Sequence, residues 1–220
     1  MNNIRDWNIY LVTDRNLSLG RSLSEICEAA IKGGVSVIQI REKSLDSRTF
    51  FQEAMAVRDL MRNSRIPLII NDRIDIALAV EADGVHLGQS DIPLREARDI
   101  LGPDRIIGWS VESPEDIRSQ EASIADYLAV GPIFFTSTKS DISQPWGIEG
   151  MRSARSITDK PLVAIGGLSE SNIRDVVDAG ADCVALVSAI VSAHDVKSTT
   201  EMLSKLVLES KLVRDGQSRS

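Results

Sequence analysis

Short apolar runs alternate with amphipathic helix patterns along the whole chain, and this pair occurs eight times. The apolar runs are mostly continuous, which is typical of parallel strands that are buried on both faces. Eight strand–helix pairs in 220 residues predict the α/β class and a single (β/α)8 TIM barrel, because a doubly wound sheet would have fewer strands or a longer chain. The expected strands span residues 9–12, 35–40, 67–70, 84–87, 105–108, 127–130, 162–165 and 183–187.

The ends of the expected helices carry recognisable signals. Ser22 and Glu25 form a capping box at the start of the first helix, and Gly33-Gly34 follows its last apolar residue. Ser169 stands where it can cap the helix after the seventh strand.

The chain shows no division into separate domains. Expected strands and helices follow one another through short connections, and no Pro-, Gly- or Ser-rich stretch interrupts them. We therefore interpret residues 1–212 as one barrel domain and residues 213–220 as a frayed C-terminal tail.

Charge and composition limit the expected partners. The formal net charge is −7 and no cluster of Lys and Arg stands out, so we expect neither nucleic acid nor a membrane as a partner. No signal peptide is expected at the N-terminus, and Cys27 and Cys183 lie inside apolar patterns, as buried reduced thiols of a cytoplasmic protein do. The sequence leaves a homo-oligomer open.

Polar side chains gather where the second, third and fourth expected strands end, and barrels build active sites at such strand ends. Gln39, Arg41 and Lys43 alternate along one strand and share one side, which suits an anion with more charge than a carboxylate. Asp72 and Asp91 follow the next two strands and could share one Mg²⁺. Two alternatives stay open: both carboxylates could cap helices, and both cations could form surface ion pairs.

A second group of polar residues follows the sixth, seventh and eighth strands. The loop 136–139 carries hydroxyls and one ammonium, which suit a phosphorylated ligand. Gly166-Gly167 and Ser188 resemble the phosphate site that barrels form after their last two strands. Two anionic subsites, one of them with Mg²⁺, favour displacement of pyrophosphate between two phosphorylated small molecules. His86 lies inside an apolar strand and is interpreted as a packed core residue.

The chain resembles the thiamine phosphate synthase family in several motifs, which occur in the family's order. They are Gln39-Ile40-Arg41-Glu42-Lys43, Asn71-Asp72-Arg73, residues 84–89 with Asp91, residues 131–139, residues 164–167 and residues 187–190. The resemblance implies a transferase that joins 4-amino-2-methyl-5-hydroxymethylpyrimidine diphosphate to 4-methyl-5-(2-phosphooxyethyl)thiazole. The products would be thiamine phosphate and pyrophosphate, formed by dissociative displacement with Mg²⁺ as cofactor.

The resemblance also implies a role for each matching residue. Arg41, Lys43 and Lys139 would be catalytic, and Asp72 and Asp91 would bind Mg²⁺. The pyrimidine diphosphate would be bound by Gln39, Ile40, Arg41, Glu42, Lys43, Asn71, Ser110 and Lys139. The thiazole phosphate would be bound by Thr136, Ser137, Thr138, Gly167, Val187 and Ser188.

Two positions depart from the family pattern. Phe135 stands where many relatives have proline, and Glu112 stands where the related thiazole tautomerases have a catalytic histidine. The second departure disfavours a tautomerase. A thiazole tautomerase and a non-catalytic binding protein on the same barrel remain the alternative hypotheses.

Overall fold

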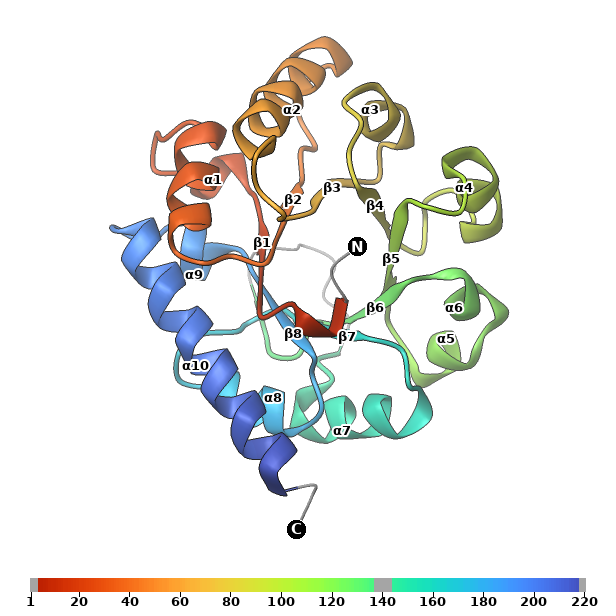
Figure 1. The fold of residues 1–220 in the computed structure, drawn as a ribbon. Helices are drawn as coiled ribbons and strands as arrows, with labels where there is room; N and C mark the ends of the chain where they lie inside the picture. Colours follow the sequence, from red (N-terminus) through yellow and green to blue (C-terminus); the bar gives the residue numbers. More distant parts are fainter. Residues whose placement is uncertain (1–3, 137–143, 218–220) are drawn as a thin grey trace.

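A computed structural model describes residues 4–136 and 144–217, which form a closed barrel of eight parallel strands (Figure 1). The strands follow sequence order around the barrel, and β1 closes it by pairing with β8. The predicted TIM barrel is therefore confirmed, although the fifth strand extends three residues beyond its expected end. The strands are β1 Ile9–Val12, β2 Val37–Ile40, β3 Leu68–Asn71, β4 Gly84–Leu87, β5 Ile106–Val111, β6 Tyr127–Val130, β7 Leu162–Ile165 and β8 Cys183–Leu186.

Helices surround the barrel as an outer ring, which Figure 1 shows in a view along the barrel. In the part of the chain that the structure describes, no helix combines the length and the apolar character that crossing a bilayer requires. The helices are α1 Leu23–Lys32, α2 Ser47–Met61, α3 Ile74–Ala79, α4 Leu94–Leu101, α5 Pro114–Arg118, α6 Gln120–Ile124, α7 Gly147–Ile157, α8 Ile173–Asp178, α9 Ser188–Val191 and α10 Val196–Gln217, with short 3₁₀ turns η1 Ile4–Asp6 and η2 Arg15–Leu17.

The strands separate two apolar cores. Ile9 and Leu11 on β1 face the helices, whereas Tyr10 and Val12 face the barrel interior, because successive side chains of a strand point to opposite sides. Trp7 lies in the inner core below the strands and is almost fully buried. Side chains therefore fill the lower part of the barrel interior.

The structure confirms one predicted helix cap and corrects another. Ser22 Oγ accepts the Glu25 N–H at 3.3 Å, and Glu25 Oε2 accepts the Ser22 N–H at 2.8 Å, which completes the capping box of α1. Ser169 caps no helix, because α8 begins only at Ile173. The backbone N–H of Ser169 instead donates to Asn172 Oδ1 in the turn before α8.

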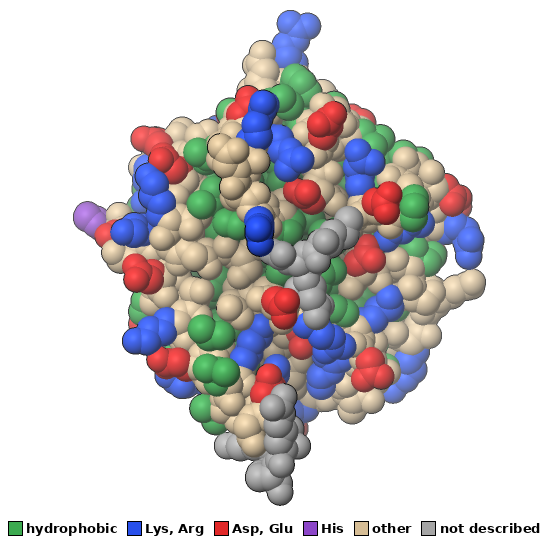
Figure 2. All heavy atoms as spheres, in the orientation of Figure 1, with side chains coloured by type: hydrophobic (Ala, Val, Ile, Leu, Met, Phe, Trp, Pro, Cys, Tyr) green, Lys and Arg blue, Asp and Glu red, His purple; other side chains and the backbone are tan. Residues whose placement is uncertain are grey.

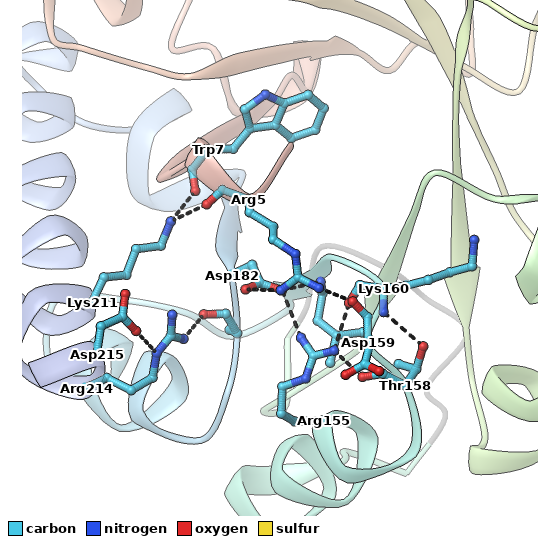
Figure 3. Close-up of polar contacts among 12 residues, drawn as sticks. Arg5, Trp7, Arg155, Thr158, Asp159, Lys160, Asp182, Lys211, Arg214 and Asp215 are labelled. Carbon is cyan, nitrogen blue, oxygen red and sulfur yellow. Dashed lines mark hydrogen bonds and ion pairs between the residues drawn. The ribbon is translucent and has the colours of Figure 1, made fainter. Parts of the chain in front are cut away.

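The last helix extends beyond the point where we expected a tail. Residues 213–217 belong to α10, and Arg214 Nη1 donates to the carbonyls of Val177 and Ala181 at 3.2 and 2.8 Å. Lys211 Nζ donates to the carbonyl of Trp7 at 2.7 Å, below the barrel (Figure 3). These contacts to distant carbonyls hold the helix end in place, and residues 218–220 lie outside the described residues.

Three aspartates repeat one arrangement at the N-terminal ends of the strands, opposite the strand ends where an active site was expected. Each carboxylate accepts a backbone N–H of the preceding strand at 2.7–2.9 Å and pairs with an arginine from the helix before that strand. The sets are Asp83 with Leu68 and Arg58, Asp126 with Ile107 and Arg98, and Asp182 with Leu162 and Arg155. Figure 3 shows the pair of Asp182 and Arg155.

Asp182→Ala is expected to lower the free energy of unfolding by about 3 kcal/mol, because it leaves a half-buried arginine without its carboxylate. Asp126→Ala is the matched control and should cost about 1 kcal/mol, because 40% of the Asp126 side chain is exposed against 9% for Asp182. Urea unfolding monitored by circular dichroism measures both. Equal losses for the two variants would contradict this ranking.

Candidate active site

A cavity opens at the C-terminal ends of the strands and is lined by residues of all eight strands or of the segments that follow them. This is the end of a TIM barrel at which active sites are built. The sequence-predicted site residues that line the cavity are Gln39, Arg41, Asn71, Ser110, Thr136, Gly167, Val187 and Ser188. The barrel thus brings members of both predicted groups to one space, whereas Lys43, Asp72 and Asp91 do not line it.

Two residues expected at the pyrimidine diphosphate lie elsewhere. Ile40 is buried in the core between strands and helices. Glu42 Oε2 accepts a hydrogen bond from Arg15 Nε at 2.9 Å, away from the cavity. The side chains of both residues therefore point away from the cavity, as the alternation that brings Gln39 and Arg41 to it requires, and substrate binding by these two residues stays a prediction. Ser137, Thr138 and Lys139 lie outside the described residues.

Asp72, Asp91 and Lys43 do not line the cavity and form a cluster of their own, in which Asp72 directly follows the cavity-lining Asn71 in the chain. Lys43 Nζ donates to Asp72 Oδ2, and Asp91 Oδ2 accepts the Gly88 N–H at 2.7 Å. Burial raises the pKa of the Asp91 carboxyl, opposed by the Gly88 hydrogen bond, and the nearby Asp72 carboxylate raises it further. The two carboxylates are therefore close enough to repel each other.

Neither of these aspartates caps a helix. The cap positions of α3 and α4 are Arg73 and Pro93, and no side chain accepts a backbone N–H at either. Asp72 has a φ of +59°, a left-handed conformation that non-glycine residues adopt rarely and that concentrates at functional sites. The helix-cap alternative is therefore not the arrangement in the structure.

The acidic pair fits a Mg²⁺ ion that also binds a ligand. Mg²⁺ is commonly held by one or two carboxylates, with water and substrate phosphate oxygens as its other ligands. Asp72 and Asp91 supply those two carboxylates from adjacent strands, and their mutual repulsion favours a cation between them. Among residues 4–136 and 144–217, no group of three or more His, Cys, Asp or Glu could hold a metal by itself.

Arg41 reaches the cavity from the end of β2. Its backbone N–H donates to Thr13 Oγ1 at 3.1 Å, which fixes the residue after the last strand position. Its Nη1 lies 3.7 Å from Asp14 Oδ2, too far for a hydrogen bond. Arg41 therefore has the acidic neighbour that the ion-pair alternative expects and also lines the cavity, and anion binding by its guanidinium stays a prediction.

The loop after β7 has a backbone that only glycine suits. Gly166 and Gly167 have φ values of +98° and +67°, and a Cβ on Gly167 would lie 2.7 Å from the Cβ of Phe134. The Phe134 N–H donates to the Gly166 carbonyl at 3.0 Å, and Asn172 Nδ2 donates to the Gly167 carbonyl at 2.9 Å. Gly166, Gly167 and Ser188 all line the cavity.

The sequence analysis missed a row of polar side chains inside the barrel. His86 was interpreted as a core residue; it is buried, yet both its ring nitrogens are hydrogen-bonded and it lines the cavity. Its partners are Tyr127 Oη at 3.0 Å and Ser110 Oγ at 2.9 Å. The sequence does contain a signal for this row. Alternation along β4 turns His86 toward the barrel interior, and a buried imidazole needs hydrogen-bond partners there.

Comparisons with known proteins agree on one family. A family model described as thiamine monophosphate synthase matches residues 9–190. A thiamine-phosphate synthase of Albidiferax ferrireducens is 52% identical over 187 residues, covering 85% of each chain. One from Chloroflexus aurantiacus is 48% identical over 204 residues, covering 93% of this chain and 94% of the relative. The solved thiamine phosphate pyrophosphorylase from Pyrococcus furiosus superimposes with a TM-score of 0.87 at 37% identity, covering 95% of this chain and 99% of its own.

Proposed function

This chain belongs to the thiamine monophosphate synthase family, and we propose that its strand-end cavity joins an aminopyrimidine diphosphate to a thiazole phosphate. The chain is accordingly a transferase that forms thiamine phosphate, with pyrophosphate as the second product. One observation supports the assignment of the site: Gln39, Arg41 and Asn71 line the same cavity as the glycine loop and Ser188.

The residues after β2 and β3 bind the pyrimidine diphosphate. Gln39 and Asn71, which are buried, and Ser110 on β5 offer amide and hydroxyl groups to the ring, because all three line the cavity. Arg41, which lines the cavity, and Lys43, which pairs with Asp72, offer positive charge to the diphosphate, and Lys139 is expected to join them.

Asp72 and Asp91 are the residues that would hold Mg²⁺. A bound Mg²⁺ neutralises negative charge on the diphosphate as it leaves. Lys43, which pairs with Asp72, is well placed to share in that neutralisation. Burial and the Asp72 charge both disfavour an ionised Asp91 in the absence of a cation, which supports a cation-binding role for the pair.

The reaction needs charge stabilisation rather than proton transfer. The bond between the exocyclic CH₂ carbon and the diphosphate oxygen breaks, and its electron pair leaves with pyrophosphate. The aminopyrimidine ring donates electron density to the resulting carbon cation. The thiazole nitrogen then attacks that carbon with its lone pair. Arg41 and Lys43 stabilise the departing charge, and the cavity holds both reactants in line.

The glycine loop and the start of α9 bind the thiazole phosphate. The left-handed backbone at Gly166 and Gly167 brings main-chain groups close to the ligand, as phosphate sites of barrels require. Thr136 and Ser188 add hydroxyls from either side of this loop, and Val187 adds main-chain groups. Ser137 and Thr138 are expected to extend the same subsite.

Release of pyrophosphate from purified protein tests this function. The aminopyrimidine diphosphate and the thiazole phosphate are supplied together and singly, each with Mg²⁺ and with EDTA. Synthase activity requires both substrates and Mg²⁺. Isomerisation of a thiazole carboxylate phosphate without pyrophosphate release would instead identify a tautomerase, and binding without turnover would identify a non-catalytic barrel.

We extend the proposal to a cytoplasmic location. Cys27 and Cys183 are both buried and free, as expected where thiols stay reduced. On the face drawn in Figure 2, Lys and Arg side chains alternate with Asp and Glu, and no broad basic surface is visible there. Small phosphorylated molecules are the partners that the site fits, and homo-oligomerisation stays open.

Ser188→Ala is expected to raise KM for the thiazole phosphate by about 5–30-fold, because one hydrogen bond to a charged group contributes about 1–2 kcal/mol. KM for the pyrimidine diphosphate should change little. Ser192→Ala is the control at the other end of α9, since Ser192 donates to the Leu17 carbonyl and does not line the cavity. Equal weakening of both substrates by Ser188→Ala would mean that the two subsites are misplaced.

A further inference from the structure

Five polar side chains form an unbroken row of hydrogen bonds across the barrel interior, here called the polar row: Gln39, Tyr10, Tyr127, His86 and Ser110. Gln39 Nε2 lies 2.7 Å from Tyr10 Oη, and Tyr10 Oη lies 2.7 Å from Tyr127 Oη. Tyr127 Oη lies 3.0 Å from His86 Nδ1, and His86 Nε2 lies 2.9 Å from Ser110 Oγ. The row begins on β2, passes through β1, β6 and β4, and ends on β5.

Packing holds the rings of the polar row in place. Trp7 meets Tyr10 and Tyr127 edge to face with centroids 5.9 and 5.6 Å apart, and His86 stacks on Tyr127 at 5.6 Å. Gly108 lets the Tyr127 ring cross β5, because a Cβ there would lie 2.0 Å from Tyr127 Cζ. The hydrogen bonds of the row therefore keep one geometry.

Proton counting makes the polar row directional. A hydroxyl donates only one hydrogen bond, and a neutral imidazole has one N–H and one acceptor nitrogen. When Gln39 Nε2 donates to Tyr10, the Tyr10 proton goes to Tyr127 and the Tyr127 proton goes to His86 Nδ1. His86 then carries its proton on Nε2 and donates to Ser110 Oγ.

Burial supports this proton count for the two tyrosines. It raises the pKa of both Tyr10 and Tyr127 above the ordinary value, so each remains a hydroxyl with one proton. A reversal at one end of the row therefore requires a reversal at every position. The two end residues cannot change their hydrogen-bonding character independently.

Both ends of the polar row face the cavity. We propose that Tyr10, Tyr127 and His86 are positioning residues that keep Gln39 as an acceptor and Ser110 as a donor toward the pyrimidine ring. This inference rests on the proposed function. A 4-aminopyrimidine matches that order, because its amino group donates and its ring nitrogens accept. A 4-oxopyrimidine reverses it, with an accepting oxygen and a donating ring N–H, so the row selects the amino ring.

The protonation of His86 is measurable on the ligand-free protein. The chain has two histidines, so a His194→Gln background leaves His86 as the sole signal in ¹⁵N NMR of histidine-labelled protein. The expected result is a neutral ring with its proton on Nε2 and a bare Nδ1. A proton on Nδ1, or on both nitrogens, would overturn the direction of the row.

Selectivity tests the consequence for the ligand. Calorimetry compares the diphosphates of the 4-amino and 4-oxo rings, and the wild type should bind the amino ring at least about 100-fold more tightly. Tyr127→Phe should lower that preference about tenfold and give His86 a mixture of both protonation forms, because the donor to Nδ1 is lost. Tyr10→Phe should lower the preference by a similar factor while His86 keeps its proton on Nε2.

Trp7→Phe is the matched control, because Trp7 packs on both tyrosines without belonging to the polar row and phenylalanine keeps an aromatic ring against them. It should leave the preference and the His86 proton unchanged. A Tyr127→Phe protein that folds and keeps the full preference would overturn the proposal. None of these measurements depends on turnover. If His86 carried its proton on Nε2 but the protein released no pyrophosphate, only the proposed function would be rejected. If the protein released pyrophosphate but His86 carried its proton elsewhere, only the proposal for the polar row would be rejected.

Discussion

Asp91→Asn is expected to lower kcat for pyrophosphate release about 10³-fold at saturating substrates, and added Mg²⁺ should restore little of it. The lost carboxylate leaves charge on the departing diphosphate less well neutralised, an effect of several kcal/mol at about 1.4 kcal/mol per tenfold. Asparagine retains an oxygen that can accept the Gly88 N–H, which Asp91 accepts at 2.7 Å. The loop after β4 should therefore keep its shape while the charge is lost.

Asp46→Ala is the control for loss of a carboxylate near the strand ends. Asp46 caps α2 by accepting the N–H groups of Arg48 and Thr49 at 3.0 Å, and it does not line the cavity. Its removal should weaken the start of α2, lower the melting temperature slightly and leave kcat unchanged. If Asp91→Asn kept near-wild-type turnover at limiting Mg²⁺, Asp91 would only hold the loop after β4 in place and would not bind the metal.

Local patterns in the sequence were sufficient to predict the barrel. Continuous apolar runs marked every strand, and the Ser22–Glu25 box marked the start of α1. The end of α10 was missed because Leu212 and Val213 are 66% and 53% exposed, which breaks the amphipathic pattern. The end of α10 is held by hydrogen bonds from Arg214 to the carbonyls of Val177 and Ala181. Such contacts between distant residues cannot be predicted from a local sequence pattern.

Local sequence patterns were likewise insufficient to predict every residue of the cavity. Alternation along β2 predicted that Gln39 and Arg41 share a side, and both line the cavity. It did not reveal that Tyr10 and Tyr127 meet, since 117 residues separate them and only closure of the barrel brings their hydroxyls to 2.7 Å. Single tyrosines in apolar strands look like core residues, and only the closed barrel shows them as members of one polar row.

Lys43→Ala is expected to lower kcat about 10²–10³-fold, by removing a cation from the site where diphosphate charge develops. In the structure Lys43 also balances the charge of Asp72, which lies beside Asp91. Its loss should therefore increase the dependence of the rate on Mg²⁺ as well. Steady-state pyrophosphate release across a Mg²⁺ titration measures both effects.

The stability of the same variant separates a catalytic loss from a folding defect. The Lys43 side chain is 57% exposed, and an ion pair at such a site contributes at most about 1 kcal/mol, so the melting temperature should move by only a few degrees. Lys32→Ala is matched to it, since Lys32 is 59% exposed and pairs with Glu28 on the outer face of α1. Both variants should lose similar, small amounts of stability, and only Lys43→Ala should lose turnover. If Lys43→Ala instead melted many degrees lower while each folded molecule stayed fully active, Lys43 would be a structural partner of Asp72 and not part of the reaction.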